Sequence, residues 1–301
     1  MENQHKAYLY GIATVLLWST VASAFKISLK YLDPVQLLLY ASIISTMILT
    51  LILLVKGRIS ILFSYSPSQY LHSLKVGLLN PFLYYLVLFK AYDLLPAQVA
   101  QPLNYTWALT LAFLSIPLLK QKIGAREIVA GIICYLGVVV ISSRGEIVNF
   151  SSFNPIGVIL ALASTVIWSL GWILNTKDDR DPVASLLLAF LYGLPFIFIA
   201  CMFFSSLNIP DLRGLLGAAY VGTLEMGITF VFWLKALKLS ENTAKVGYLI
   251  FLSPFLSLLF IHFIVGEEIM APTFIGLVFI VSGLMIQGLG KRKKKETGIK
   301  R

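Results

Sequence analysis

Charged side chains are scarce in this sequence. Asp, Glu, Lys and Arg together make up 13% of the 301 residues, and hydrophobic residues make up 58%, whereas soluble domains carry roughly 25% charged residues. A water-soluble fold of this length has too little interior to hide so much apolar surface. The composition therefore excludes an ordinary soluble enzyme or binding module and predicts that this chain is embedded in a lipid bilayer.

Residues suited to redox or metal chemistry are equally few. The two cysteines, Cys134 and Cys201, lie inside apolar stretches without metal-ligand spacing, so neither a disulfide framework nor a metal site is predicted. The one acidic cluster, Asp178–Asp181, falls in a short predicted loop, and its last member is explained as a helix cap. Because no nucleophile is placed beside a base, we expect neither an enzyme nor a cofactor.

Basic charge is concentrated at one end of the chain. The net charge is +10, and seven of the 24 lysines and arginines lie in residues 291–301. Such a tail is typical of a solvated anchor beside anionic lipid. We therefore expect no nucleic-acid partner.

Long apolar runs fill the rest of the sequence. A helix needs about 20 apolar residues to span hydrocarbon, and open strands cannot satisfy their backbone groups in lipid. The sequence therefore predicts an all-α integral membrane protein with ten transmembrane helices. Asp33 and Asp181, each followed by proline, are expected to cap the second and seventh of them. The predicted spans are residues 7–25, 34–55, 73–92, 97–119, 125–143, 155–176, 182–204, 212–234, 244–265 and 271–289.

Lysine and arginine also indicate the orientation. With the N-terminus inside, 19 of the 24 basic residues fall in cytoplasmic segments, as the positive-inside rule requires. Both termini are therefore expected to be cytoplasmic. The run from Lys6 to the small residues Ala22–Ala24 resembles a signal peptide, but we expect it to remain as the first helix.

The two halves of the chain repeat each other. Trp18 and Trp168 are 150 residues apart, the two Asp-Pro pairs are 148 apart, and the Lys-Ala pairs at Lys90 and Lys235 are 145 apart. Five spans per half is an odd number, so the second half must enter the membrane from the opposite side. The repeats are then inverted, and in such transporters the substrate binds near the midplane between the halves. The expected units are a first five-helix repeat at 1–148, a second, inverted one at 149–290, and a cytoplasmic tail at 291–301.

Trp18 and Trp168 lie near the middle of their spans, within the stretches "LLWST" and "VIWSL". An indole N–H at that depth needs a partner that lipid does not offer. Two interpretations remain open. Both indoles line a cavity between the halves, or they are packing bulk while Ser19 and Ser169 bond back to carbonyls of their own helices.

Glu225 is the one acidic residue placed deep within a predicted span. A charge there costs roughly 2.5–3.5 kcal/mol, so the carboxyl must be protonated, paired or exposed to water. Its counterpart 145 residues earlier is Asn80. Proton coupling, binding of a substrate amine, and a structural hydrogen bond to a neighbouring helix are the open alternatives for Glu225.

Polar and aromatic residues also crowd the fourth span of each half. Residues at helical spacing share a face there, and the proline in each span frees a backbone carbonyl. We expect these groups to face an aqueous cavity together with the midplane residues. The candidate substrate-binding residues are Trp18, Asn80, Tyr84, Gln101, Asn104, Tyr105, Trp107, Trp168, Glu225, Tyr248 and Ser253, and Glu225 is also the candidate coupling residue.

These motifs together resemble a known family. The Trp-Ser in each half and the segment 240–269, which contains Gly266-Glu267, resemble EamA-type permeases of the drug/metabolite transporter superfamily. "LLWST", and "NYTW" followed by "LTLAF", are also similar to the aromatic amino acid exporter branch. The resemblance implies a proton-linked or facilitated efflux carrier whose cavity is walled by spans 1, 3, 4, 6, 8 and 9. Two departures weaken the transfer of a specific substrate: Gln121-Lys122 replaces Gly-Glu in the first half, and Ala108 stands where the exporter branch tends to have proline.

The function expected from the sequence is export of amino acids or similar small metabolites by alternating access, with protons as a possible coupling partner. The alternatives are a carrier for a nucleotide-linked sugar or a cationic drug, and a membrane scaffold. The expected location is a bacterial inner membrane. The expected partners are a small-molecule substrate and the lipid bilayer, and the chain is expected to be a monomer or a homodimer.

Overall fold

The computed structural model describes residues 2–119, 125–143, 154–175, 178–208, 210–240 and 248–297. Within these ranges every regular element is a helix, as the sequence predicts. The first half contains α1 (Glu2–Ser28), α2 (Pro34–Val55), η1 (Ile59–Phe63), α3 (Pro67–Gly77), η2 (Leu78–Leu83), α4 (Tyr84–Leu94), α5 (Ala97–Tyr105), α6 (Trp107–Leu119) and α7 (Ala125–Ser142). The second half contains α8 (Pro155–Asn175), α9 (Pro182–Phe204), α10 (Leu212–Tyr220), η4 (Val221–Ile228), α11 (Thr229–Leu239), η5 (Tyr248–Leu252), α13 (Ser253–Phe260), η6 (Ile261–Val265) and α14 (Ala271–Thr297).

Six helices are long and apolar enough to cross a membrane. They are Asn3–Ser28, Pro34–Val55, Pro67–Leu94, Pro155–Asn175, Pro182–Phe204 and Leu212–Trp233, and three shorter apolar helices cover Ile128–Ile141, Leu249–Val265 and Ala271–Ile286. The bundle exposes large apolar side chains such as Met47 (65% exposed) and Ile159 (65%). A surface of this kind is suited to lipid rather than to water.

The predicted helix starts at the two Asp-Pro pairs are confirmed. Asp33 accepts hydrogen bonds from the backbone N–H groups of Val35 and Gln36, and the Gln36 side chain accepts one from the Asp33 N–H in return. Asp181 likewise accepts hydrogen bonds from the backbone N–H groups of Val183 and Ala184 at the start of α9. These caps satisfy backbone donors that the first helical turn leaves free.

Predicted spans in both halves are interrupted. The span 97–119 breaks at Thr106, whose N–H bonds to the Leu103 carbonyl and ends α5, so that α6 begins at Trp107. The third span of each half contains a π-helical segment, η2 and η4, where hydropathy alone predicts continuous helix. In η2, Asn80 has non-helical torsions (φ −146°, ψ 116°) beside Pro81, whose ring lacks an N–H and clashes with the preceding turn.

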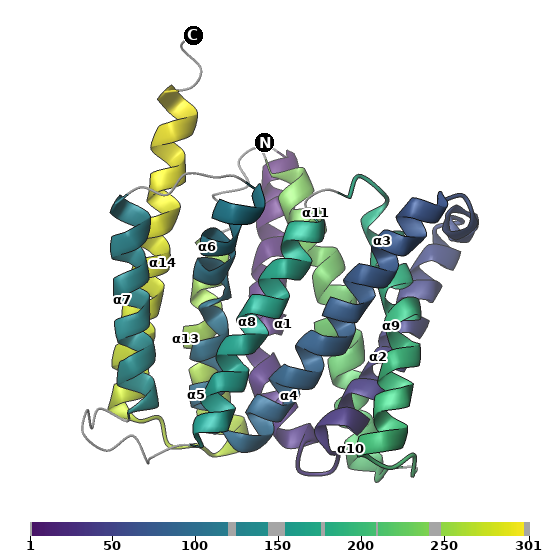
Figure 1. The fold of residues 1–301 in the computed structure, drawn as a ribbon, viewed down its shortest axis with the longest axis horizontal. Coiled ribbons are helices and arrows are strands. Elements are labelled where there is room, and N and C mark those ends of the chain that lie inside the picture. Colours follow the sequence, from purple (N-terminus) through teal and green to yellow (C-terminus); the bar gives the residue numbers. More distant parts are fainter. Residues whose placement is uncertain are drawn as a thin grey trace.

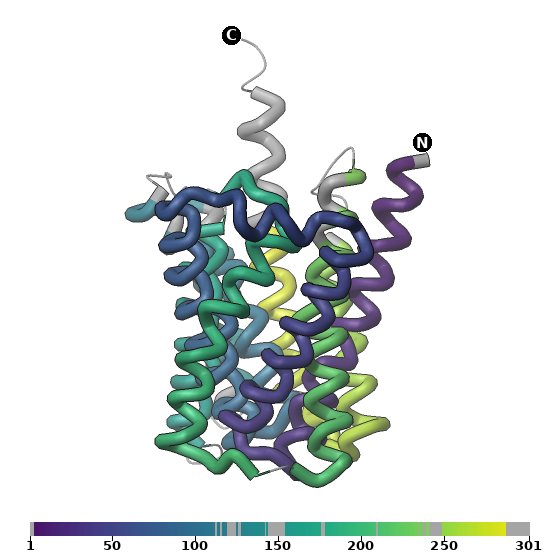
Figure 2. The backbone as a smooth tube through the Cα atoms, turned by 90° about the vertical axis from the view of Figure 1, so that its right-hand side faces the viewer, coloured from purple at the N-terminus to yellow at the C-terminus, as the bar shows by residue number. Residues whose placement is uncertain are grey.

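The helices pair across the two halves. α1 packs along α11 and α8 along α4, while α2 packs along α9 and α7 along α14. The α7–α14 pair lies at one edge of the bundle and the α2–α9 pair at the other (Figure 1; the latter in front in Figure 2). α1 begins at the end of the bundle toward which α14 runs (Figure 1).

Candidate functional site

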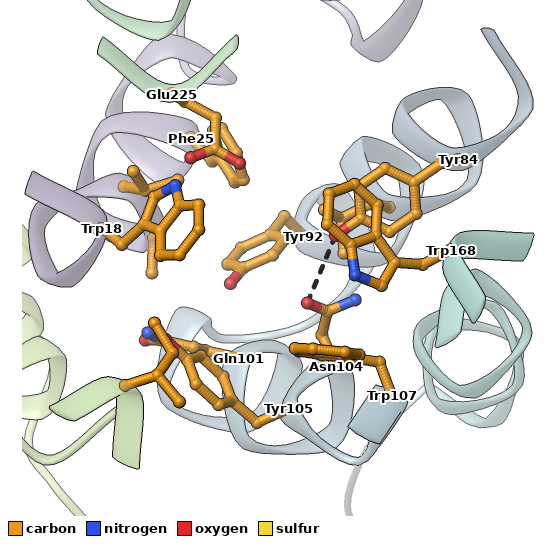
Figure 3. Close-up of a pocket in the computed structure, with 14 residues that line it drawn as sticks. Trp18, Phe25, Tyr84, Tyr92, Gln101, Asn104, Tyr105, Trp107, Trp168 and Glu225 are labelled. Atoms are coloured by element: carbon orange, nitrogen blue, oxygen red, sulfur yellow. Dashed lines mark hydrogen bonds between the residues drawn. The ribbon is translucent and has the colours of Figure 1, made fainter. Parts of the chain in front are cut away.

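A cavity lined by helices of both halves, here called the central cavity, is drawn in Figure 3. Its walls come from α1, α4, α5, α6, η5, α8 and η4, which belong to both halves of the chain. The lining residues are Trp18, Val21, Ala22, Phe25, Tyr84, Leu88, Tyr92, Gln101, Asn104, Tyr105, Trp107, Trp168, Glu225 and Ile250. Half of them are aromatic, so the cavity is bounded mainly by flat ring surfaces.

Glu225 is the one charged side chain among these lining residues. It is 8% exposed, and its Oε1 accepts a hydrogen bond of 3.1 Å from the hydroxyl of Tyr85. The indole nitrogen of Trp18 is turned toward the same carboxyl group (Figure 3). Oε2 has no hydrogen-bond partner among the described residues. A buried carboxyl oxygen without a partner is costly, so this atom is available to a ligand or a proton.

The fourth span contributes the amide side chains of Gln101 and Asn104 and the phenol of Tyr105, all three on α5. The hydroxyl of Tyr84 donates to Oδ1 of Asn104 at 3.4 Å, and Nδ2 of Asn104 donates to Oγ of Ser164 on α8 at 2.9 Å. The hydroxyl of Ser257 donates to Oε1 of Gln101. These bonds hold both ends of the Asn104 amide and the oxygen of the Gln101 amide. The Nε2 group of Gln101 is left as a donor beside the cavity.

Trp168 closes the opposite wall from Glu225 (Figure 3). Its ring centroid lies 4.5 Å from that of Tyr84, 6.4 Å from that of Trp107 and 5.8 Å from that of Phe230. The Trp168 Nε1 atom is buried without a hydrogen-bond partner among the described residues. Each of these two walls therefore holds one buried polar atom without a hydrogen-bond partner among the described residues, an acceptor in Glu225 and a donor in Trp168.

The serines beside the two tryptophans behave differently. Ser19 donates to the Val15 carbonyl of its own helix at 2.5 Å, as the packing interpretation predicts, and also contacts Ser253 at 3.2 Å. Ser169 instead donates to the carbonyl of Trp107 at 3.1 Å. This bond ties α8 to the first turn of α6.

The structure brings eight of the eleven candidate residues together around one cavity. They are Trp18, Tyr84, Gln101, Asn104, Tyr105, Trp107, Trp168 and Glu225. Asn80 lines a second cavity instead, and Ser253 is fully buried behind Ser19. The side chain of Tyr248 lies outside the described residues.

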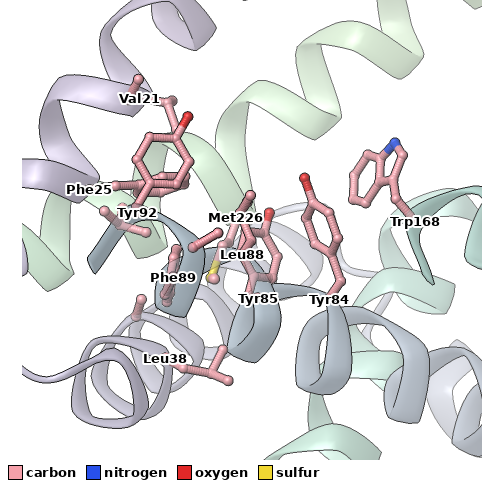
Figure 4. Close-up of a cluster of buried hydrophobic side chains, with 14 of the residues drawn as sticks. Val21, Phe25, Leu38, Tyr84, Tyr85, Leu88, Phe89, Tyr92, Trp168 and Met226 are labelled. Carbon is pink, nitrogen blue, oxygen red and sulfur yellow. The ribbon is translucent and has the colours of Figure 1, made fainter. Parts of the chain in front are cut away.

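Sequence reasoning missed three aromatic residues of this region. Phe25 lies two turns after Trp18 on α1, and Tyr92 two turns after Tyr84 on α4. Both follow their partners at helical spacing on one face, so extending the two faces toward the helix ends would have found them. Tyr85, which binds Glu225, lies beside Tyr84 within the buried cluster drawn in Figure 4. No sequence signal predicted that contact.

A network at the far end of the bundle from the N-terminus joins the two halves. The Glu267 carboxylate accepts hydrogen bonds from the backbone N–H groups of Ala97 (2.8 Å) and Gln98 (3.1 Å). The Gln98 side chain in turn donates to the Glu268 carbonyl and accepts from the N–H of Met270. The Gly266-Glu267 motif thus caps α5, and Gly266 supplies the left-handed turn (φ 80°) that ends η6.

The chemistry of the central cavity is that of a binding site. No Lys, Arg or His side chain is among its lining residues, and within the described ranges no cluster of His, Cys, Asp or Glu could hold a metal ion. The site offers one carboxyl group, two amides, phenol and indole donors, and ring faces. Such groups recognise small polar solutes that carry an amine or an apolar part.

Known proteins of the same kind match nearly the whole chain. An uncharacterized transporter of Archaeoglobus fulgidus is 25% identical over 288 residues, which cover 93% of this chain and 96% of the relative. The uncharacterized inner membrane transporter YhbE of Escherichia coli is 20% identical over 94% of this chain and 91% of its own length. A crystal structure of a protein with 23% identity superposes with a TM-score of 0.69 over 95% of this chain and 98% of that one, which shows the shared fold.

The EamA-like transporter family matches residues 5–143 and 155–288. These two matches leave out the segment between α7 and α8 and the basic tail. This chain is an integral membrane protein and belongs to the EamA-like transporter family.

Proposed function

We propose that this protein exports amino acids or similar small metabolites across a bacterial inner membrane by alternating access. The observation that carries the proposal is the central cavity, in which Glu225 and Trp168 present a free acceptor and a free donor on opposite walls. An amino acid matches this arrangement. Its ammonium group pairs with Glu225, its carboxylate accepts from Trp168 and Gln101, and its side chain contacts the rings.

The helix contacts support a carrier of two inverted halves. A two-fold axis that exchanges the halves would place the α1–α11 contact onto the α8–α4 contact. It would place the α2–α9 and α7–α14 pairs onto themselves, and these are the pairings observed. The π-helical segments η2 and η4 occupy corresponding third spans. On this proposal ten spans form two five-helix repeats, both termini are cytoplasmic, and the halves rock around the central cavity.

Glu225 is the proposed coupling residue. Its carboxyl group lies in a closed, largely apolar environment in which a charge is costly unless a partner is present. A proton and a substrate ammonium group can each meet this need, and only one of them at a time. Export of one solute in exchange for one proton then follows from competition for the same carboxyl group.

One alternative has a specific observation in its favour. The same carboxyl group within an aromatic cavity fits an organic cation through charge pairing and cation–π contact. A nucleotide-linked sugar fits less well, because its phosphates would meet Glu225 and no basic side chain among the lining residues. A scaffold role would not explain why the Glu225 acceptor and the Trp168 donor have no hydrogen-bond partner among the described residues.

The test is solute flux in liposomes, measured for a panel of amino acids and an organic cation with and without a pH gradient. Glu225→Gln removes the charge while keeping the shape, so coupled flux is expected to fall by about tenfold or more. Asp93→Asn is the matched control, because the Asp93 side chain is 35% exposed and pairs with Lys90 on α4. Normal proton-dependent flux through Glu225→Gln would remove Glu225 from the mechanism, and flux of the cation alone would favour the alternative.

A further inference from the structure

A second cavity is lined by helix ends and a loop at the end of the bundle at which α1 begins. It opens between α3 with η2, α8 and α9, and it reaches the loop that joins α8 to α9. The lining residues are Val76, Asn80, Trp168, Gly171, Trp172, Asn175, Asp178, Arg180, Pro182, Ser185, Leu186, Ala189 and Phe230. The distribution of lysine and arginine assigns this end to the cytoplasm.

Two aromatic rings separate this chamber from the central cavity. Trp168 lines both cavities. Phe230 lines the second chamber, and its ring centroid lies 5.8 Å from that of Trp168 and 5.9 Å from that of Trp18, which lines the first cavity. The boundary between the two cavities therefore includes these aromatic side chains. Side chains can change rotamer without moving a helix.

Neither ring of the partition is held by a polar bond. The Trp168 Nε1 atom has no hydrogen-bond partner among the described residues, and phenylalanine has no polar group to anchor. Phe230 is also the second residue of α11, which begins directly after the π-helical η4. Irregular turns of this type occur frequently at functional sites. The two rings are therefore held by ring packing alone, without a hydrogen bond that would fix one rotamer.

An ion pair between Arg180 and Asp178 lies at the mouth of the chamber, and its two charges cancel. Arg180 donates from Nε and Nη2 to Asp178 at 2.8 and 2.7 Å, and from Nη1 to Gln69 and Ser73 on α3. Burial acts to raise the pKa of the Asp178 carboxyl, but the hydrogen bonds and charge of Arg180 outweigh it and lower that pKa. Because the charges cancel, the chamber offers amides and indole faces to a solute without net charge.

We propose that this second chamber is a waiting site for the transported solute on the cytoplasmic side, and that Trp168 and Phe230 form the gate between it and the central cavity. Asn80 and Asn175 supply hydrogen bonds to a zwitterionic or neutral polar solute, and Trp172 supplies a surface for its apolar part. The inference rests on the proposed export function for the identity of the solute. The chamber and the gate rest on the geometry alone.

Gly171 gives a direct test of the chamber. It lines the second chamber, does not line the first, and a Cβ built on it meets no atom within 4 Å. Gly171→Leu should therefore fill the chamber and lower export by about tenfold, while Gly171→Ala, the matched control, changes it less than about twofold. Binding of an amino acid to the purified protein, measured by tryptophan fluorescence, should survive in both variants. Normal export by Gly171→Leu would overturn the waiting site. Loss of both binding and export in this variant would also overturn it, because the substitution would then act on the central cavity.

The gate is tested without any solute. The two native cysteines are buried, so Ala22→Cys in the central cavity serves as a reporter for a membrane-impermeant maleimide added from the cytoplasmic side. Phe230→Ala in this background should speed labelling by about tenfold, whereas Phe230→Leu, which keeps most of the bulk, should label like the parent. Equal labelling in all three would refute the gate. Because this readout needs no substrate, it separates failure of the gate from failure of the proposed export function.

Discussion

Replacement of Glu267 tests whether the Gly-Glu motif stabilises the end of the bundle farther from the N-terminus. α5 begins at Ala97 after Pro96, and Pro96 makes no side-chain cap. The first backbone N–H groups of α5, those of Ala97 and Gln98, instead donate to the two carboxylate oxygens of Glu267 at 2.8 and 3.1 Å. The carboxylate comes from the other half of the chain, so it acts both as a helix cap and as a link between the halves.

The size of the effect follows from these two bonds. A hydrogen bond to a charged group contributes about 1.5–3 kcal/mol, and a carboxylate at a helix N-terminus adds about 0.3–1 kcal/mol through the helix dipole. Glu267→Gln keeps one amide oxygen as an acceptor but loses the charge and the second bond, so the free energy of unfolding should fall by about 1–2 kcal/mol. Glu267→Ala removes both bonds, and a loss of about 2–3 kcal/mol is expected.

The measurement is unfolding in detergent micelles combined with amide hydrogen exchange. Both Glu267 variants should unfold more easily, and exchange should quicken at Ala97 and Gln98 ahead of other α5 amides. Glu268→Gln is the matched control, because the Glu268 side chain is exposed and its role is carried by its backbone carbonyl. The reasoning is refuted if Glu267→Gln and Glu268→Gln unfold alike and the α5 amides keep their protection.

Two further predictions concern packing and charge. Gly77→Ala should destabilise the protein by about 1–3 kcal/mol in the same unfolding assay, because the new methyl group would collide with the Ala189 carbonyl where α3 crosses α9; unchanged stability would show that the helices part easily. Arg180→Lys should also destabilise it, because lysine cannot form the paired bonds to Asp178, and the difference from the parent should shrink in acid. Because the pKa of Asp178 is lowered in the folded protein, the ion pair stabilises the fold at neutral pH, and this stabilisation is lost as the pH falls through the lowered pKa. A stability difference between Arg180→Lys and the parent that does not change with pH would exclude the ion pair as the cause of that difference.

The element boundaries were largely predictable because apolar runs and caps are local signals. Pro34–Val55 and Pro182–Phe204 begin and end at the predicted residues, since Asp-Pro marks each start and polar residues follow each end. The break at Thr106 and the π-helical segment η4 were not predicted. Hydropathy does not distinguish an α turn from a π turn, and the irregular turns depend on what packs beside them.

The candidate site was predictable only in part. Polar and aromatic residues at mid-span were a sound guide, and they led to Trp18, Gln101, Trp168 and Glu225 around one cavity. Asn80 was placed with them by its alignment to Glu225, yet it lines the other chamber. Its non-helical backbone in η2 redirects the side chain, and alignment of the halves carries no such information.

The sequence by itself determined the solvent, the helical class and the depth of the polar residues, because each depends on composition and on the fixed rise of a helix. Only the tertiary structure decided that Glu267 caps a helix 170 residues away, that Tyr85 binds Glu225 and that Trp168 lines two cavities. These contacts join residues far apart in the chain. They depend on crossing angles and small residues at helix contacts, which local patterns do not encode.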